Sequence, residues 1–110
     1  MKISEEQRPQ ALVMVIEGRL DSNNSTALEE VLPERARSHP ALVVDMTAVP
    51  YVSSAGLRVL LKGAKSAKAS GHRLALAGLS ESVREVFDIS GFSSIFTLEP
   101  DVEAALNAVA

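Results

Sequence analysis

The sequence contains no cysteine and no tryptophan, and its 110 residues include only one tyrosine and three phenylalanines. Without cysteine it cannot form a disulfide framework, a thiolate metal site or a cysteine nucleophile. The scarcity of aromatic rings argues against a base-stacking platform, and the net charge of −3 provides no basic excess for nucleic acid. No apolar run approaches the roughly 18 residues of a membrane-spanning helix, and the N-terminal stretch has no apolar signal core. We therefore expect a cytoplasmic protein that contacts neither nucleic acid nor membrane directly.

The motifs of common catalytic centres are also missing. The sequence has no G-x-S-x-G elbow, no GxxxxGK[ST] phosphate loop and no GxGxxG fingerprint. His39 and His72 each lack a second ligand at metal spacing, which favours solvated side chains over a metal site. Asp21 and Asp45 could pair as general acid and base, but a helix cap and a strand-end residue account for them better. We expect no catalytic residues, no metal and no cofactor.

Strand and helix patterns alternate along the chain. Apolar runs predict strands at residues 11–17, 41–45 and 73–78, with shorter candidates at 2–5 and 94–99. Helical spacing covers residues 27–32, 54–70, 83–87 and 102–109. This alternation predicts an α/β fold in which a mainly parallel sheet of four to five strands is flanked by about four helices. We expect residues 1–110 to form a single domain.

Two prolines and one apolar run give sharper structural expectations. Pro33 lacks an N–H, so it predicts either a kink near Leu32 or a stop there, followed by a short second turn to Ser38. Pro100 is expected in the first turn of the last helix. Residues 41–45 are apolar up to the final aspartate, which predicts a central strand covered on both faces.

Two adjacent serines, Ser53 and Ser54, stand directly before the longest helical pattern and are followed by the small residues Ala55 and Gly56. One hydroxyl is enough to cap a helix by accepting a hydrogen bond from a free backbone N–H. Small side chains leave the helix start open to a partner, and a helix N-terminus tolerates a phosphate. The residues alone favour a cap and leave a phosphorylation switch open.

Three stretches in register resemble a known family. They are GRLD at residues 18–21, VVDMTAVPYVSSAGLRVLL at 43–61 and VREVFDISGF at 83–92. Together they resemble a STAS domain and, more narrowly, the bacterial anti-sigma factor antagonists, over about residues 11–109. The resemblance implies a STAS fold like that of SpoIIAA, and a binding module rather than an enzyme.

The resemblance also implies a switch mechanism and its residues. Ser54 corresponds to the phosphorylated serine, although many members carry aspartate at the position of Ser53. The implied partner-binding residues are Asp21, Ser53, Ser54, Ala55, Gly56 and Arg58. Asp45 is implied to end the central strand beside the phosphosite. The implied partners are an anti-sigma factor that is a GHKL-type serine kinase, which the unphosphorylated protein binds, and a PP2C-type phosphatase that removes the phosphate.

Two other functions stay open at this point. The chain could be a fixed STAS subunit of a transporter or lipid-trafficking complex, in which Ser54 would be only a cap. It could also be a small-ligand sensor, because an open α/β sheet offers crevices at its strand carboxyl ends. Arg58, Lys62 and Lys65 share one helix face, which we interpret mainly as solvated, with Arg58 as a candidate contact for an acidic partner.

Overall fold

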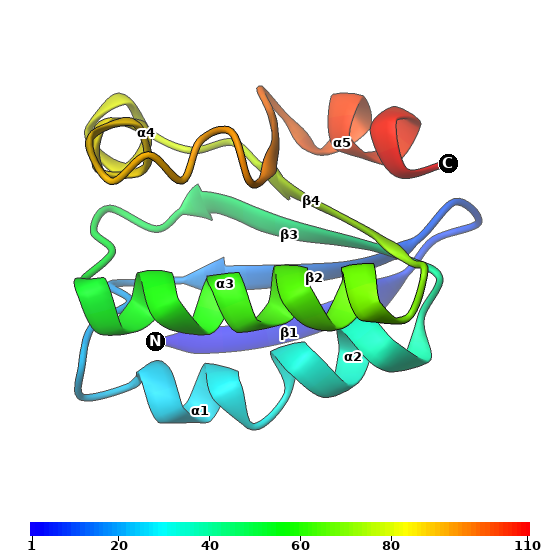
Figure 1. Cartoon of the computed structure of the whole chain (residues 1–110), viewed down its shortest axis with the longest axis horizontal. Coiled ribbons are helices and arrows are strands. Elements are labelled where there is room, and N and C mark those ends of the chain that lie inside the picture. Colours follow the sequence, from blue (N-terminus) through cyan, green and yellow to red (C-terminus); the bar gives the residue numbers. More distant parts are fainter.

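The computed structural model describes all 110 residues, which form a five-stranded sheet with helices on both faces (Figure 1). The strands are β1 (Lys2–Gln7), β2 (Leu12–Glu17), β3 (Ala41–Ala48), β4 (Arg73–Ala77) and β5 (Thr97–Glu99). The helices are α1 (Ser25–Glu29), α2 (Leu32–Ser38), α3 (Ser54–Ala69), α4 (Glu81–Ile89) and α5 (Val102–Val109). The strands lie in sequence order; β1 is antiparallel to β2, and all other neighbours are parallel. The predicted mainly parallel α/β sheet is confirmed.

Strand β3 lies at the centre of the sheet and is covered on both faces, as its apolar run predicts. Val43 and Val44 both have 0% of their surface exposed. Because successive side chains of a strand point to opposite faces, these two valines belong to different cores. Val44 lies in the larger core, which contains residues of α1, α2 and α3, whereas Val43 packs with residues of α5.

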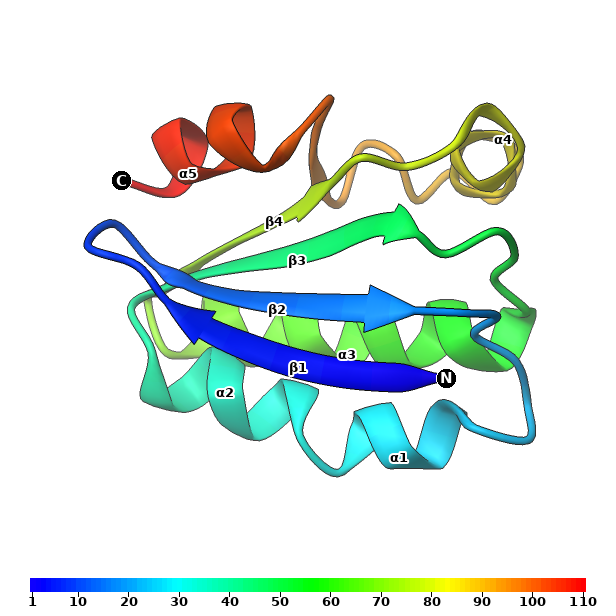
Figure 2. The ribbon, with the colours of Figure 1, turned by 180° about the vertical axis from the view of Figure 1, so that it is seen from behind.

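The two faces of the sheet carry unequal layers. Figure 2 shows α1, α2 and α3 on one side of the sheet and α5 on the other. Helix α4 sends Val83 and Phe87 into the larger core, where Phe87 meets Phe96 edge to face at 5.2 Å between ring centroids. None of the helices is both long and apolar enough to cross a membrane.

The prolines mark helix boundaries, one as predicted and one not. The helical pattern after residue 25 stops at Glu29 and resumes at Leu32, with Pro33 in the first turn of α2, where a missing N–H costs nothing. The stop-and-restart alternative is therefore confirmed. The placement of Pro100 inside the last helix was wrong. Asp101 caps α5 by accepting a hydrogen bond from the Ala104 N–H at 2.8 Å, so Pro100 precedes the cap.

Candidate partner-binding site

Two loops that follow the carboxyl ends of β2 and β3 lie side by side near the start of α3. Between them, the Leu20 N–H donates to the carbonyl of Tyr51 at 2.9 Å, and the Ser53 N–H donates to the carbonyl of Leu20 at 2.8 Å. Leu20 and Val52 form an isolated parallel bridge, and both side chains are buried. Backbone pairing therefore joins the GRLD stretch to the serine pair, which are far apart in the sequence.

The residues that flank this bridge point outward, because side chains alternate along extended backbone. They are Arg19 and Asp21 on one loop and Tyr51 and Ser53 on the other. The Arg19 guanidinium lies 4.3 Å from the centroid of the Tyr51 ring, and its Nε lies 3.9 Å from Oδ2 of Asp21. An exposed stack of this kind contributes about 0.5–1 kcal/mol. We call Arg19, Asp21, Tyr51, Ser53 and Ser54 the serine surface.

The two serines have different hydrogen bonding. Ser53 is the N-cap of α3, and its Oγ accepts a hydrogen bond from the Gly56 N–H at 3.1 Å. Its carbonyl accepts the next helical bond from the Leu57 N–H at 2.9 Å. Ser54 is the first residue of the helix; it is exposed, and its hydroxyl makes no hydrogen bond within the protein. The cap that the sequence predicts is therefore Ser53, and the Ser54 hydroxyl is free.

Gly56 allows the first turn of α3 to approach the neighbouring loop closely. A Cβ at this position would lie 2.6 Å from Cγ of Leu20 and 3.0 Å from its carbonyl oxygen. Gly56 is buried, so it supports the serine surface from below. Ala55 is half-buried, and Arg58 is exposed on the next turn.

Asp21 organises the turn before α1. Its Oδ1 accepts a hydrogen bond from the Asn23 N–H at 3.0 Å, and its own N–H donates to Oδ1 of Asn24 at 2.9 Å. Asn24 occupies the N-cap position of α1 without a side-chain cap bond, so the interpretation of Asp21 as a helix cap was wrong. The reason is that Asp21 lies three residues before the cap position and closes a turn there instead. Its Oδ2 faces Arg19.

The family follows from comparison with known proteins. Residues 2–105 match the model of the STAS domain. The chain belongs to the STAS family. BtrV of Bordetella bronchiseptica, which is assigned as an anti-sigma factor antagonist, is 38% identical over 109 residues, covering 98% of this chain and 94% of BtrV.

Solved STAS structures agree with this assignment. The structure of an anti-sigma factor antagonist from Mycobacterium paratuberculosis has a TM-score of 0.88 at 27% identity and covers 98% of this chain and 92% of that one. SpoIIAA in its unphosphorylated form has a TM-score of 0.81 at 19% identity, covers 98% of this chain and 96% of SpoIIAA, and shares the fold. The expected SpoIIAA-like STAS fold is confirmed. The chain belongs among the anti-sigma factor antagonists, which are binding regulators rather than enzymes.

One residue that the resemblance implies near the phosphosite lies elsewhere in this STAS domain. Asp45 alternates with Val44 and Met46, which face the α1–α3 side, so its side chain is on the α5 side of the sheet. There its Oδ1 accepts hydrogen bonds from the N–H and the hydroxyl of Thr47, at 3.0 and 2.6 Å. Placing Asp45 beside the start of α3 was therefore wrong. The strand also continues past Asp45 to Ala48.

Sequence reasoning missed two members of the serine surface, Arg19 and Tyr51. Their signal was faint: an arginine inside the GRLD stretch and the chain's only tyrosine, in the loop before the serines. Each residue is unremarkable alone, because a cation–π stack depends on the pairing of two loops that are distant in sequence. No three His, Cys, Asp or Glu side chains anywhere in the chain converge to hold a metal ion.

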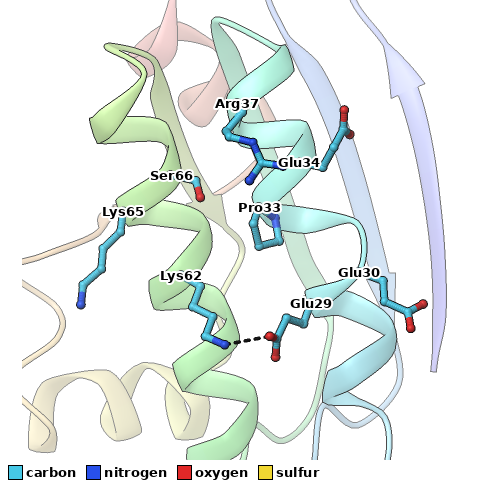
Figure 3. A pocket seen from close by; sticks show the side chains of 8 residues that line it. All are labelled: Glu29, Glu30, Pro33, Glu34, Arg37, Lys62, Lys65 and Ser66. Atoms are coloured by element: carbon cyan, nitrogen blue, oxygen red, sulfur yellow. Dashed lines mark hydrogen bonds and ion pairs between the residues drawn. The ribbon is translucent and has the colours of Figure 1, made fainter.

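A groove between α3 and the helices α1 and α2 is lined only by polar and charged residues and Pro33 (Figure 3). Lys62 crosses it to bind Glu29, at 2.7 Å between Nζ and Oε2. Beside it, a hydrogen bond from Arg35 holds the pKa of Glu34 below its usual range, while Arg35 also bonds Glu5 on β1 at 2.8 Å. Lys62 thus pairs with Glu29 across the groove and Arg35 with Glu34 beside it, and exposed ion pairs of this kind are typical of a solvated helix surface.

Proposed function

We propose that this protein is an anti-sigma factor antagonist that is switched by phosphorylation of Ser54. In its unphosphorylated form it binds an anti-sigma factor that is also a GHKL-type serine kinase. The kinase transfers the γ-phosphoryl group of ATP to the Ser54 oxygen; the bond between the β and γ phosphates breaks, ADP leaves, and the hydroxyl proton passes to the kinase. The phosphorylated protein then dissociates, and a PP2C-type phosphatase restores the hydroxyl. Because the cycle consumes ATP, we place it in the cytoplasm.

The single observation that carries the proposal is the division of roles between the two serines. Ser53 satisfies the helix end, so the free hydroxyl of Ser54 can be modified without loss of the cap. A phosphate there gains from the positive end of the α3 dipole, and it adds about −1.5 to −2 charge to the surface. The expected switch changes the charge of the surface and leaves the fold as it is.

A charge at Ser54 acts on binding because it would be removed from water at the interface. Half-buried Asp21 already contributes one carboxylate to the same surface. A second negative group that lacks a partner cation costs about 2–5 kcal/mol when an interface covers it. We therefore assign the partner contact to Asp21, Ser53, Ser54, Ala55 and Arg58, with Gly56 as their buried support.

Phosphate transfer tests this proposal directly. The protein is incubated with ATP and the GHKL-type kinase encoded nearest to it in its genome, and the intact mass is followed over time. We expect one phosphate on the wild type and on Ser53→Ala, and none on Ser54→Ala.

Two outcomes would contradict the proposal in different ways. If Ser53→Ala blocks phosphate transfer and Ser54→Ala does not, the acceptor is Ser53. If neither serine accepts phosphate although the kinase binds the protein and phosphorylates a control substrate, the switch is wrong. The fixed-subunit alternative would then take its place, with Ser54 as an unmodified residue of the helix start.

A further inference from the structure

A second concave surface lies at the other end of α3 and differs in chemistry from the groove of Figure 3. It has a volume of about 830 Å³ and runs between the C-terminal half of α3, the start of β4 and the segment that leads into β5. Its apolar lining includes Leu61, Ala64, Leu74, Ile95 and Phe96. Ile95 is 53% exposed, so part of this apolar surface faces water. A concave site of this size, with an apolar floor and a few polar groups, is the usual form of a small-molecule site.

The rim of this groove is basic. Lys65, Lys68, Arg73 and half-buried His72 line it, and its 13 lining residues include no aspartate or glutamate. We call the surface the basic groove. His72 is fixed by a hydrogen bond of 3.0 Å between its Nδ1 and the carbonyl of Ala36. Figure 3 shows Lys65 extending from α3 away from the acidic residues of α1 and α2.

The cations of the basic groove lack the partners that other cations of the chain have. Six lysines and arginines have a carboxylate within 4.0 Å: Lys2, Arg8, Arg19, Arg35, Lys62 and Arg84. The other five of the 11 do not: Arg37, Arg58, Lys65, Lys68 and Arg73. Arg73 instead donates to the carbonyl of Ala108 on α5 at 3.5 Å, so Lys65 and Lys68 are the unpaired cations that extend over the groove, in a protein whose net charge is −3. Unpaired positive charge above an apolar floor complements a ligand with an anionic head and an apolar body.

We propose that the basic groove binds a single small amphiphilic anion, with a phosphate or carboxylate head at Lys65 and Lys68 and an apolar chain along Leu74 and Ile95. A concave groove of about 830 Å³ suits one such molecule in solution rather than the plane of a bilayer. The groove lies at the amino ends of β4 and β5, because Arg73 and Thr97 are the first residues of those strands. This differs from the sequence-based expectation of a crevice at the strand carboxyl ends.

The basic groove is separate from the serine surface. Ser54 and Lys68 are fourteen residues apart on one straight helix, which corresponds to roughly 21 Å along its axis. Ligand and partner could therefore occupy the two ends of α3 together. The inference does not depend on the phosphorylation switch, and Ser54→Ala is expected to bind the ligand as the wild type does.

The test uses decyl phosphate as the probe, below its micelle concentration, with isothermal titration and the melting temperature as readouts. We expect saturable one-to-one binding and a higher melting temperature, because a ligand of the native state stabilises it. Decanol, which lacks the charge, and inorganic phosphate, which lacks the chain, are each expected to bind about tenfold more weakly or not at all. In amide spectra, the shifts are expected at Ala64, Ile95 and Thr97.

Charge-reversing variants locate the site. Lys65→Glu combined with Lys68→Glu is expected to weaken decyl phosphate binding by about tenfold or more, since it removes both head-group contacts. The matched control is Arg37→Glu, which reverses an exposed, unpaired cation outside the basic groove and is expected to leave affinity unchanged. Ile95→Ser tests the apolar floor at an exposed position and is expected to weaken binding.

Several results would overturn the inference. Decyl phosphate could fail to bind, could bind the double variant as well as the wild type, or could bind no better than decanol. A lowered melting temperature would show that the probe acts as a denaturing surfactant. Binding to vesicles of anionic lipid without binding of the monomeric probe would indicate a membrane-facing surface instead.

Discussion

The two ends of α3 differ in their contacts with the rest of the protein. At its start, Ser53 caps the helix, and Gly56 leaves no room for a side chain against Leu20. At its end, Lys65 and Lys68 extend over a groove, and Gly71 has nothing within 4 Å of where its side chain would be. The start is held by short, specific contacts, whereas the end presents long side chains without partners.

This difference indicates what each end can do. A helix start that is capped and closely packed keeps its position when a charge is added, so a phosphate there is presented on a fixed surface. Cations without partners can contact an anionic ligand without first breaking an ion pair within the protein. Substitutions at both ends of α3 test this contrast.

Ser54→Asp is expected to produce the largest effect, and on binding alone. A fixed charge at the interface should weaken binding of the partner kinase by about 3 kcal/mol, roughly a hundredfold or more. The melting temperature should hardly change, because aspartate suits the first turn of a helix. Titration calorimetry and thermal unfolding measure the two quantities.

The control for Ser54→Asp makes the same change at the other end of α3. Ser70→Asp places the carboxylate at the exposed C-cap of the helix, where it opposes the dipole and costs about 0.5 kcal/mol of stability. Kinase binding should not change. If Ser70→Asp weakens binding as much as Ser54→Asp, binding depends on the net charge of the protein rather than on a charge at the serine surface.

Gly56→Ala is expected to have the next largest effect, on stability. The added methyl group would collide with Leu20, including its backbone oxygen, and we expect a loss of about 1–2 kcal/mol after the better helix propensity of alanine is counted. Urea unfolding measures this loss. A neutral or stabilising result would show that the Leu20 loop can move away.

Gly71 provides the contrast at the open end of the helix. Its φ is +72°, so Gly71→Ala should cost about 1 kcal/mol through backbone strain although space is free. Asparagine tolerates this conformation better, so Gly71→Asn should recover part of the loss. The same replacement, Gly56→Asn, should recover nothing, because a collision and not the backbone angle is the cause there.

Most of the sheet could be predicted from sequence, because most of its strands are apolar runs in the sequence. The run at 41–45 predicted a central strand, and Val43 and Val44 are both fully buried. The apolar run does not show which of its residues face α3 and which face α5. That depends on how the neighbouring strands pair with β3, and in the structure Asp45 lies on the face opposite to α3.

The site was predicted in its position but only partly in its details. Adjacent serines before a helix predict a cap, yet either of them satisfies the same pattern; the distinction rests on the hydrogen bond from Gly56. Pro100 was misplaced because both Pro100 and Asp101 are favoured at helix starts, and the carboxylate took the cap. The stack of Arg19 on Tyr51 needs the pairing of two distant loops, which no local pattern encodes.

Replacing each of the two serines separately by alanine is expected to have a smaller effect on stability. The difference between the two variants separates the roles of the serines. Ser53→Ala should cost about 1 kcal/mol of unfolding free energy, since it removes the cap. Ser54→Ala should change stability by no more than about 0.3 kcal/mol, because its hydroxyl is unbonded and alanine is a good helix former. Urea unfolding of both variants gives the comparison. Equal losses would contradict the assignment of Ser53 as the cap.

The smallest expected effect concerns Arg19. Its guanidinium is exposed, stacks on Tyr51 and lies near the Asp21 carboxylate, so Arg19→Ala should change the stability by about 0.5 kcal/mol or less. Because Arg19 stands on the same surface as Ser54, it should partly offset a negative charge there. The binding loss caused by Ser54→Asp should therefore grow by about 0.5 kcal/mol when Arg19 is removed as well. A double-mutant cycle in kinase affinity at low and high salt measures this coupling, which salt should weaken. Zero coupling at low salt would show that the stack on Tyr51 holds the cation away from Ser54, and the charge switch would then act without a counter-ion from its own surface.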